Sequence, residues 1–189
     1  MIISLTGKPG SGKSTIGLRL AEALHYKRYY IGQLWRELAR RHGITIDKLN
    51  IIGENESWPD HEVDEEVKRL EQTENNFIIE SRTAFFLIPR SVKIFLDVSE
   101  AEGARRIFGH LKQGAAKERN EGKDLNSVQD VVKANRQRLK SDTLRYKKYY
   151  NVDAFDPKNF DLWLDTTDLT PDQVFTKVLE FVKARLAGG

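Results

Sequence analysis

Residues 7–15 read Gly-Lys-Pro-Gly-Ser-Gly-Lys-Ser-Thr and follow the apolar run Ile-Ile-Ser-Leu-Thr at residues 2–6. A strand, a glycine-rich turn and the start of a helix, in that order, form the arrangement that binds nucleotide phosphates. Gly7, Gly10 and Gly12 allow the backbone to curl, so that successive N–H groups point at the phosphates beside the positive N-terminus of the helix. The spacing G-x-x-x-x-G-K-S therefore predicts a phosphate-binding loop (P-loop).

Two side chains of this loop have predicted chemical roles. Lys13 is expected to reach the β- and γ-phosphates of a bound triphosphate, and the Ser14 hydroxyl is expected to ligate Mg²⁺. The alternative is a flexible turn that contains a lysine by chance, and the complete pattern at the end of a strand disfavours it. The predicted phosphate-binding residues are Gly7, Gly10, Ser11, Gly12, Lys13, Ser14 and Thr15.

The composition suits one compact domain. The chain has 189 residues, of which 39% are hydrophobic, a size at which a single core is expected. It has no cysteine, which excludes a disulfide scaffold, thiol catalysis and cysteine-ligated metal. The chain opens directly into the first apolar run, and no apolar run approaches membrane-spanning length. We therefore expect a cytoplasmic protein that does not contact membranes.

Charge is distributed unevenly along the chain. The net charge is only +3, but acidic residues crowd residues 54–74, whereas residues 105–148 are rich in lysine and arginine. A basic half suits a polyanionic small molecule, and nucleic acid is the competing explanation. Basic residues interleaved with acidic ones on long helices usually form a solvated face, so we expect no nucleic-acid partner.

Five short apolar or β-branched runs alternate with helical patterns. This alternation predicts an α/β fold, with a five-stranded parallel sheet covered by helices on both faces, which is the three-layer architecture of P-loop NTPases. Ser99 to Glu102 and Thr170 to Gln173 are predicted helix-capping sequences, and an acidic helix is expected to begin at Asp60. The predicted strands are residues 2–6, 28–31, 76–81, 92–98 and 160–164.

Two segments interrupt the alternation. Residues 44–75 form a mostly helical, acidic excursion between the second and third predicted strands. Residues 110–127 contain two glycines and many charges, and they separate two basic helices. Both segments are expected to be movable flaps over a binding site.

Polar residues follow the predicted strands, where open α/β sheets bind their ligands. Glu80 ends the third strand and could hold Mg²⁺ opposite Ser14, whereas Asp97 occupies the comparable place in the fourth. We favour Glu80, because Asp97 could equally cap the helix that follows. Arg82 and Arg36 lie just beyond two strand ends and could converge on an anion, since guanidinium groups bind phosphate oxygens in pairs.

Two further arginines belong to an R-x-x-S-D-x-x-R-Y series at residues 138–146. Arg138 and Arg145 are seven residues apart, which places them on one face of a helix. Such a pair could close over a transferring phosphoryl group and neutralise its oxygens. The alternative is a salt-bridged helix surface.

These motifs, in this order, resemble those of the nucleoside monophosphate kinases, and among them the archaeal-type cytidylate kinases. The resemblance covers nearly the whole chain, and its later motifs are more specific than the P-loop itself. The matching stretches are G-K-P-G-S-G-K-S-T at 7–15, I-G-Q-L-W-R-E-L-A at 31–39, D-H-E-V-D at 60–64, I-I-E-S-R at 78–82, R-L-K-S-D-T-L-R-Y at 138–146, Y-Y-N-V-D at 149–153 and F-D-L-W-L-D-T at 160–166.

The resemblance implies transfer of the γ-phosphoryl group of ATP, with Mg²⁺, to CMP or dCMP by a monomeric enzyme. It implies a core formed by residues 1–31, 76–107 and 128–189, with an acceptor-binding insertion at 32–75 and a lid at 108–127. The acceptor would be held by Gly32, Arg36, Asp60, Asp64 and Arg82. The catalytic residues would be Lys13, Arg82, Arg138 and Arg145.

The chain departs from the family pattern at the helix that enters the lid. Gly103 and His110 stand where the family tends to carry arginines, and only Arg106 between them is retained. This leaves two alternatives open. One is a kinase of another small acceptor, including a hydroxyl kinase that would use Asp60 or Asp64 as its base. The other is a nucleotide-binding protein with weak or no transferase activity.

Overall fold

The computed structural model describes residues 1–115 and 125–188, and its five strands form one parallel sheet in the order β2-β3-β1-β4-β5. The predicted α/β class and its five-stranded parallel sheet are confirmed, with strand ends shifted by one or two residues. The strands are β1 (Ile2–Gly7), β2 (Lys27–Tyr30), β3 (Phe77–Glu80), β4 (Val92–Asp97) and β5 (Leu162–Asp165).

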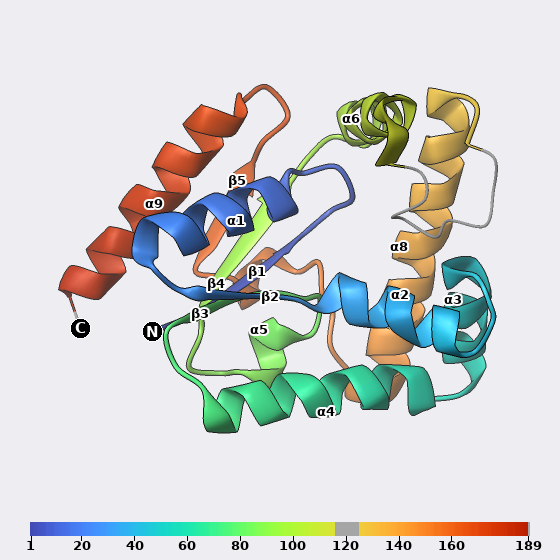
Figure 1. The fold of residues 1–189 in the computed structure, drawn as a ribbon, viewed down its shortest axis with the longest axis horizontal. Coiled ribbons are helices and arrows are strands. Elements are labelled where there is room, and N and C mark those ends of the chain that lie inside the picture. Colours follow the sequence, from blue (N-terminus) through green and yellow to red (C-terminus); the bar gives the residue numbers. More distant parts are fainter. Residues whose placement is uncertain (116–124, 189) are drawn as a thin grey trace.

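The helices cover both faces of this sheet (Figure 1). They are α1 (Lys13–Leu24), α2 (Ile31–Arg41), α3 (Ile46–Asn55), α4 (Trp58–Thr73), α5 (Ala84–Leu87), α6 (Glu100–His110), α8 (Val128–Tyr150) and α9 (Pro171–Ala187), with a π-helical turn at Leu111–Ala115 and a 3-10 turn at Pro157–Asn159. Sequence reasoning did not predict α3 and α5 as separate helices.

Alternating strand residues divide the core into two main clusters. Ile3 and Ile78 pack on one face of the sheet with apolar residues of α1 and α9. Phe77 and Ile79 pack on the other face with residues of α2, α3 and α4. Because β3 is buried on both faces, it reads as the continuous apolar run expected of a central parallel strand.

Helix termini follow the predicted caps in one case and depart from them in two. At α9, Thr170 and Gln173 form the complete predicted capping box. At α6, the Ser99 hydroxyl accepts a bond from the Glu102 N–H, but the Glu102 carboxylate turns to Arg105 and Arg106, so the box is incomplete. Helix α4 begins at Trp58 rather than Asp60, because Pro59 fits the first helical turn.

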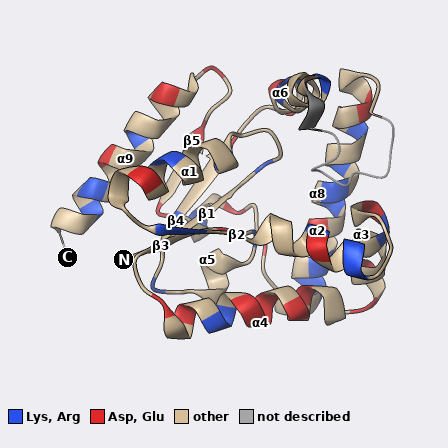
Figure 2. Ribbon diagram, in the orientation of Figure 1, with Lys and Arg blue, Asp and Glu red and all other residues tan. Residues whose placement is uncertain are grey.

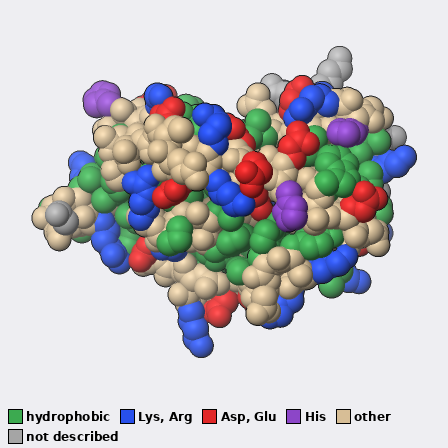
Figure 3. Space-filling view, turned by 90° about the horizontal axis from the view of Figure 1, so that it is seen from below, with side chains coloured by type: hydrophobic (Ala, Val, Ile, Leu, Met, Phe, Trp, Pro, Cys, Tyr) green, Lys and Arg blue, Asp and Glu red, His purple; other side chains and the backbone are tan. Residues whose placement is uncertain are grey.

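The acidic excursion is balanced by basic side chains that lie beside it in space. Along α4 and its neighbours, acidic and basic residues alternate (Figure 2), and the face seen from below mixes both signs (Figure 3). On this face, nearby lysine and arginine side chains therefore offset the acidic residues that crowd this part of the sequence. The ion pairs are Arg41 with Glu62, Lys68 with Glu65, Arg69 with Glu66, and Arg90 with Glu71.

Of the segment predicted to be a lid, residues 116–124 lie outside the described residues. Its described flanks are the π-helical turn after α6 and the start of α8, and α6 packs against α8 through Ala104, Ile107 and Val131. Across the part of the chain that the structure describes, no helix combines the length and apolar character needed to cross a membrane.

Candidate active site

A cavity of about 500 Å³ opens at the carboxyl ends of β1, β2 and β3. Its walls come from the P-loop, the start of α2, the inner face of α4, the residues that follow β3, helices α6 and α8, and the start of α9. This is the edge at which parallel α/β sheets bind ligands, because loops and helix N-termini meet there. Every residue of the predicted phosphate-binding set except Gly7 lines this cavity.

The P-loop needs its glycines for two different reasons. Gly10 and Gly12 have φ angles of +81° and +91°, which side chains rarely adopt. Gly10 also touches α6, because a Cβ atom on it would lie 2.2 Å from the Gly103 carbonyl oxygen. A Cβ atom on Gly103 would in turn lie 2.6 Å from the Pro9 carbonyl oxygen. Helix α6 therefore packs directly on this loop, and a side chain at position 103 would push the two apart.

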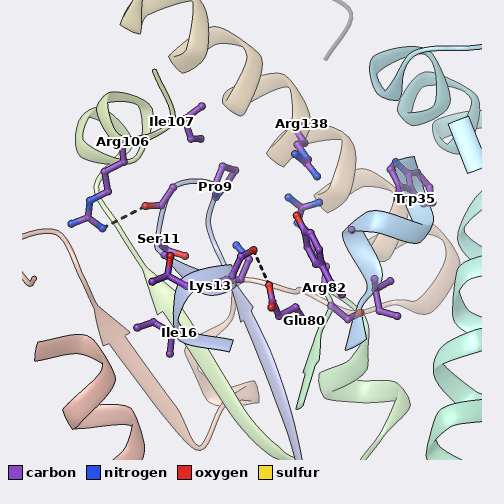
Figure 4. A pocket seen from close by; sticks show the side chains of 18 of the residues that line it. Pro9, Ser11, Lys13, Ile16, Trp35, Glu80, Arg82, Arg106, Ile107 and Arg138 are labelled. Atoms are coloured by element: carbon purple, nitrogen blue, oxygen red, sulfur yellow. Dashed lines mark hydrogen bonds between the residues drawn. The ribbon is translucent and has the colours of Figure 1, made fainter. Parts of the chain in front are cut away.

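Lys13 lies folded against its own loop. Its ammonium group donates to the carbonyl oxygens of Gly7 at 2.7 Å and Lys8 at 3.0 Å. Gly7 therefore contributes to the site from behind the loop, by holding the lysine through its carbonyl group. Lys13 lies in the cavity wall (Figure 4), which Ser14 also lines.

Ser14 and Glu80 form the site that best fits Mg²⁺. The Ser14 hydroxyl donates to Glu80 Oε2 at 2.9 Å, and the Glu80 side chain is only 1% exposed (Figure 4). Hydroxyl and carboxylate oxygens are the ligand types that Mg²⁺ prefers. Asp97, the alternative, is paired with Lys8 at 2.7 Å. The geometry therefore favours Glu80.

Three predicted phosphate-binding arginines reach the cavity from three different elements. Arg36 of α2 donates to the Tyr30 hydroxyl and the Gly32 carbonyl oxygen, both at 3.0 Å. Arg82, just after β3, pairs with Asp142 at 3.0 Å. Arg138 of α8 lines the cavity and points toward the side on which Arg82 lies (Figure 4).

The environment of Tyr30 shows how basic this wall is. Burial raises the pKa of the Tyr30 hydroxyl, but the charge and hydrogen bond of Arg36 and the charge of Arg138 lower it further than burial raises it, so the net shift is downward. An anion that enters between these arginines would meet the same favourable potential. Gly32 lies in the same wall, where a Cβ atom would approach the Tyr30 ring to 2.8 Å.

Arg145 occupies a different place from the other arginines. Its side chain is 2% exposed and contacts Asp60 at 3.1 Å, Asp142 at 3.0 Å and the Asn50 side chain at 3.0 Å. Its guanidinium group also lies 4.8 Å from the centre of the Trp35 ring. Arg145 thus belongs to a buried charged network that forms part of the cavity wall, and the catalytic role predicted for it stays a prediction.

The two predicted acceptor-side carboxylates belong to the same buried network. Burial is the main cause that raises the pKa of Asp60 to about 7, with Asp64 and Asp142 adding to it and Arg145 opposing it. Burial also raises the pKa of Asp64, which accepts bonds from the hydroxyls of Thr83 and Tyr150. At Asp60, burial and the two neighbouring carboxylates together outweigh the opposing charge of Arg145, which favours the protonated form of this carboxyl group.

Sequence reasoning missed several residues that build this site. Asn50 lies in the excursion and has no motif signal, although its side chain joins Trp35 to Arg145. Arg28 contacts Glu80. The one sequence signal for this residue is its position two residues before Tyr30, which places both side chains on the same face of β2. Arg106, noted in the sequence, donates to the Thr166 and Thr167 carbonyl oxygens and so ties α6 to the end of β5.

The fold and the cavity define a P-loop kinase, in which the loop faces an arginine-lined wall of the same cavity. Residues 3–126 match the family described as the AAA domain. The cytidylate kinase of Natronomonas pharaonis is 32% identical over 97% of this chain and 90% of its own length. The cytidylate kinase of Sulfurisphaera tokodaii is 31% identical over 95% of this chain and 93% of its own length. The chain belongs to the cytidylate kinase family.

Solved structures agree on the fold. The shikimate kinase of Bacteroides thetaiotaomicron superposes with a TM-score of 0.64, covers 97% of this chain and 98% of its own, and is 17% identical. The shikimate kinase of Aquifex aeolicus covers both chains completely, with a TM-score of 0.52 and 19% identity. At such identities the likeness establishes the P-loop kinase fold alone.

Proposed function

We propose that this protein transfers the γ-phosphoryl group of ATP to CMP or dCMP, forming ADP and CDP or dCDP. The observation that carries the proposal is the convergence of Arg36, Arg82 and Arg138 on the cavity that the P-loop lines. Three guanidinium groups beside a triphosphate site suit a second phosphate better than a neutral acceptor. The cytidylate kinases among the relatives support the choice of base.

Each residue of the site has a role in this reaction. Lys13 and the loop N–H groups would hold the triphosphate, while Arg36 and Arg82 would hold the acceptor phosphate in line with it. Arg138, which faces both, would neutralise charge on the group in transfer. Its position on α8, the helix that follows the lid segment, would link this step to lid movement.

The acceptor oxygen needs no general base, because a phosphate oxygen is already ionised at neutral pH. The carboxylates of the cavity agree with this. Both oxygens of Asp64 accept hydrogen bonds, from Thr83 and Tyr150, and Asp60 is paired with Arg145. Neither carboxylate is placed like the base that a hydroxyl kinase requires, so the phosphate acceptor is favoured over the hydroxyl alternative.

Ser14 and Glu80 would hold Mg²⁺, directly or through its water ligands. When bound there, the ion neutralises charge on the β- and γ-phosphates. We further propose that residues 32–75 bind the acceptor and residues 108–127 act as the lid, around a core of residues 1–31, 76–107 and 128–189. The monomeric state, the cytoplasmic location and the lack of a nucleic-acid partner stay predictions from the sequence.

The proposal is tested by measuring ADP formation from Mg·ATP with CMP, dCMP, UMP, AMP and GMP in turn, beside a control without acceptor. We expect CMP or dCMP to raise the rate most. If a different monophosphate is preferred, the kinase class stands and the choice of base is wrong. If no monophosphate raises the rate above the control, the proposal is contradicted.

A further inference from the structure

Arg28 of strand β2 contacts Glu80 but is not among the described residues that line the cavity. It pairs with Ile78 in the sheet register, and Tyr30, two residues later, pairs with Glu80. Arg28 and Glu80 therefore lie on the same face of adjacent strands. Arg28 Nε and Nη2 both approach Glu80 Oε1, at 2.6 Å each. Two donors of one rigid guanidinium group thus fix a single carboxylate oxygen.

This contact decides which oxygen of Glu80 faces the P-loop. With Oε1 held by Arg28, the other oxygen, Oε2, is directed to the Ser14 hydroxyl at 2.9 Å. The space behind the carboxylate is closed by α1, where a Cβ atom on Gly17 would lie 2.5 Å from Oε1. The carboxylate is thus clamped from one side by Arg28 and confined on the other by the backbone of α1.

Arg28 also supplies the partner that a buried carboxylate needs. The Glu80 side chain is 1% exposed, and a carboxylate at that depth without a hydrogen-bonding partner would rotate toward water. Arg28 itself is 25% exposed on its side chain and is not among the described residues that line the cavity. Its influence on a bound ligand must therefore pass through Glu80.

We propose that Arg28 is a positioning residue that holds the Glu80 carboxylate in the orientation needed by a divalent cation at Ser14, a role that rests on the proposed kinase function. In this role Arg28 touches neither nucleotide. Outer partners of metal ligands commonly change metal affinity by about 10–100-fold when they are removed. Loss of Arg28 is expected to weaken metal binding in that range while leaving acceptor binding unchanged.

The test compares Arg28→Met with Lys27→Met. Lys27 is the preceding residue on β2 and pairs with Glu74 at 2.7 Å, away from the site. Both variants remove one positive charge from the same strand, so Lys27→Met controls for the effect of net charge on cation binding. Binding of Mn²⁺ to the protein–ADP complex is titrated by electron paramagnetic resonance, and binding of ADP alone is measured in the presence of a chelator.

We expect Arg28→Met to weaken Mn²⁺ binding by about 10–100-fold and Lys27→Met to leave it within about 2-fold of the unmodified protein. Arg28→Lys, which keeps the charge but loses the paired donors, should fall between them. ADP affinity without metal and KM for CMP should not change in any of the three. Equal Mn²⁺ affinities for Arg28→Met and Lys27→Met, or a rise in KM for CMP as the sole effect, would overturn the proposal.

Gly17→Ala tests the same carboxylate from its other side and leaves Arg28 intact. The added methyl group should displace Oε1 from Arg28 and weaken Mn²⁺ binding as well. Unchanged Mn²⁺ affinity in Gly17→Ala would contradict the proposal that Arg28 and the backbone of α1 together hold the Glu80 carboxylate in place. Ser14→Ala separates this proposal from the proposed function. If Mn²⁺ binding in the unmodified protein is insensitive to Ser14→Ala, the metal site itself is wrong, and Arg28 loses its role with it, whatever the kinase assay shows.

Discussion

The phosphate-binding loop and the acceptor side of the cavity are built in opposite ways. The loop is one contiguous stretch, and its lysine is held by carbonyl oxygens five and six residues away. The acceptor side combines polar and charged side chains from α2, α3, α4, α8 and the residues that follow β3, and its central arginine contacts partners 85 and 95 residues away in the chain. The first half is a local structure, whereas the second half exists only when the whole domain is folded.

This difference separates function from stability. Removing a loop side chain should remove chemistry and leave the fold intact, because few other residues depend on it. Removing a member of the buried network should affect the fold first, because it leaves opposite charges without partners in the interior. The following experiments test this contrast.

The largest effect is expected for Arg145→Met. It leaves Asp60 and Asp142 buried beside an apolar side chain, and breaking a buried ion pair in this way costs about 3–5 kcal/mol of unfolding free energy. Urea denaturation measures the loss. Arg136→Met on the same helix, which removes an exposed pair with Glu100 and should hardly change stability, is the control. Similar losses of unfolding free energy in both variants would show that the buried network contributes no more to stability than an exposed ion pair.

Lys13→Met should have the reverse profile. We expect kcat to fall by about 10²–10³-fold, the range for removing one preorganised donor from a reacting oxyanion, while the unfolding midpoint in urea hardly changes. Initial rates and urea denaturation are measured on the same preparation. Lys68→Met, which removes an exposed pair on α4, should retain full activity. A Lys13→Met protein that is less stable but keeps its kcat would contradict the view that loop side chains serve the chemistry and not the fold.

Asp60→Asn should change how stability depends on pH. Burial raises the pKa of Asp60 to about 7 in the folded protein, while the unfolded chain releases that proton near 3.8. Between these values unfolding releases a proton, so this residue lowers stability as pH rises from about 4 to about 7. The asparagine variant should flatten that decline by an amount on the order of 4 kcal/mol. If the unfolding free energies of the two proteins depend on pH in the same way, the raised pKa of Asp60 is contradicted.

Thr170→Ala is expected to have the smallest effect. It removes the hydroxyl of the capping box of α9, on the sheet face opposite the acceptor side, and should cost about 1 kcal/mol of stability. The rate and KM for the acceptor should not change. A change in KM would mean that α9 and the acceptor side are coupled, so the two regions would not be independent.

The same contrast explains what the sequence could predict. The P-loop was predictable because its residues are adjacent, and Glu80 was found because a strand end has a known place in a parallel sheet. Arg28 was not, because its contact with Glu80 depends on β2 lying beside β3, which is a matter of strand order. The burial of Arg145 could not be predicted either, because a helical repeat shows which residues share a face but not what covers that face.

The most direct test of the central claim is to follow phosphorus itself. In a ³¹P nuclear magnetic resonance time course with Mg·ATP and CMP, the account predicts that the CMP phosphate signal disappears as the coupled signals of the two CDP phosphates appear, in step with ADP. A CMP signal that persists while inorganic phosphate accumulates would mean ATP hydrolysis without transfer. Either that result or the absence of any turnover would contradict the assignment of the arginine-lined cavity to an acceptor phosphate.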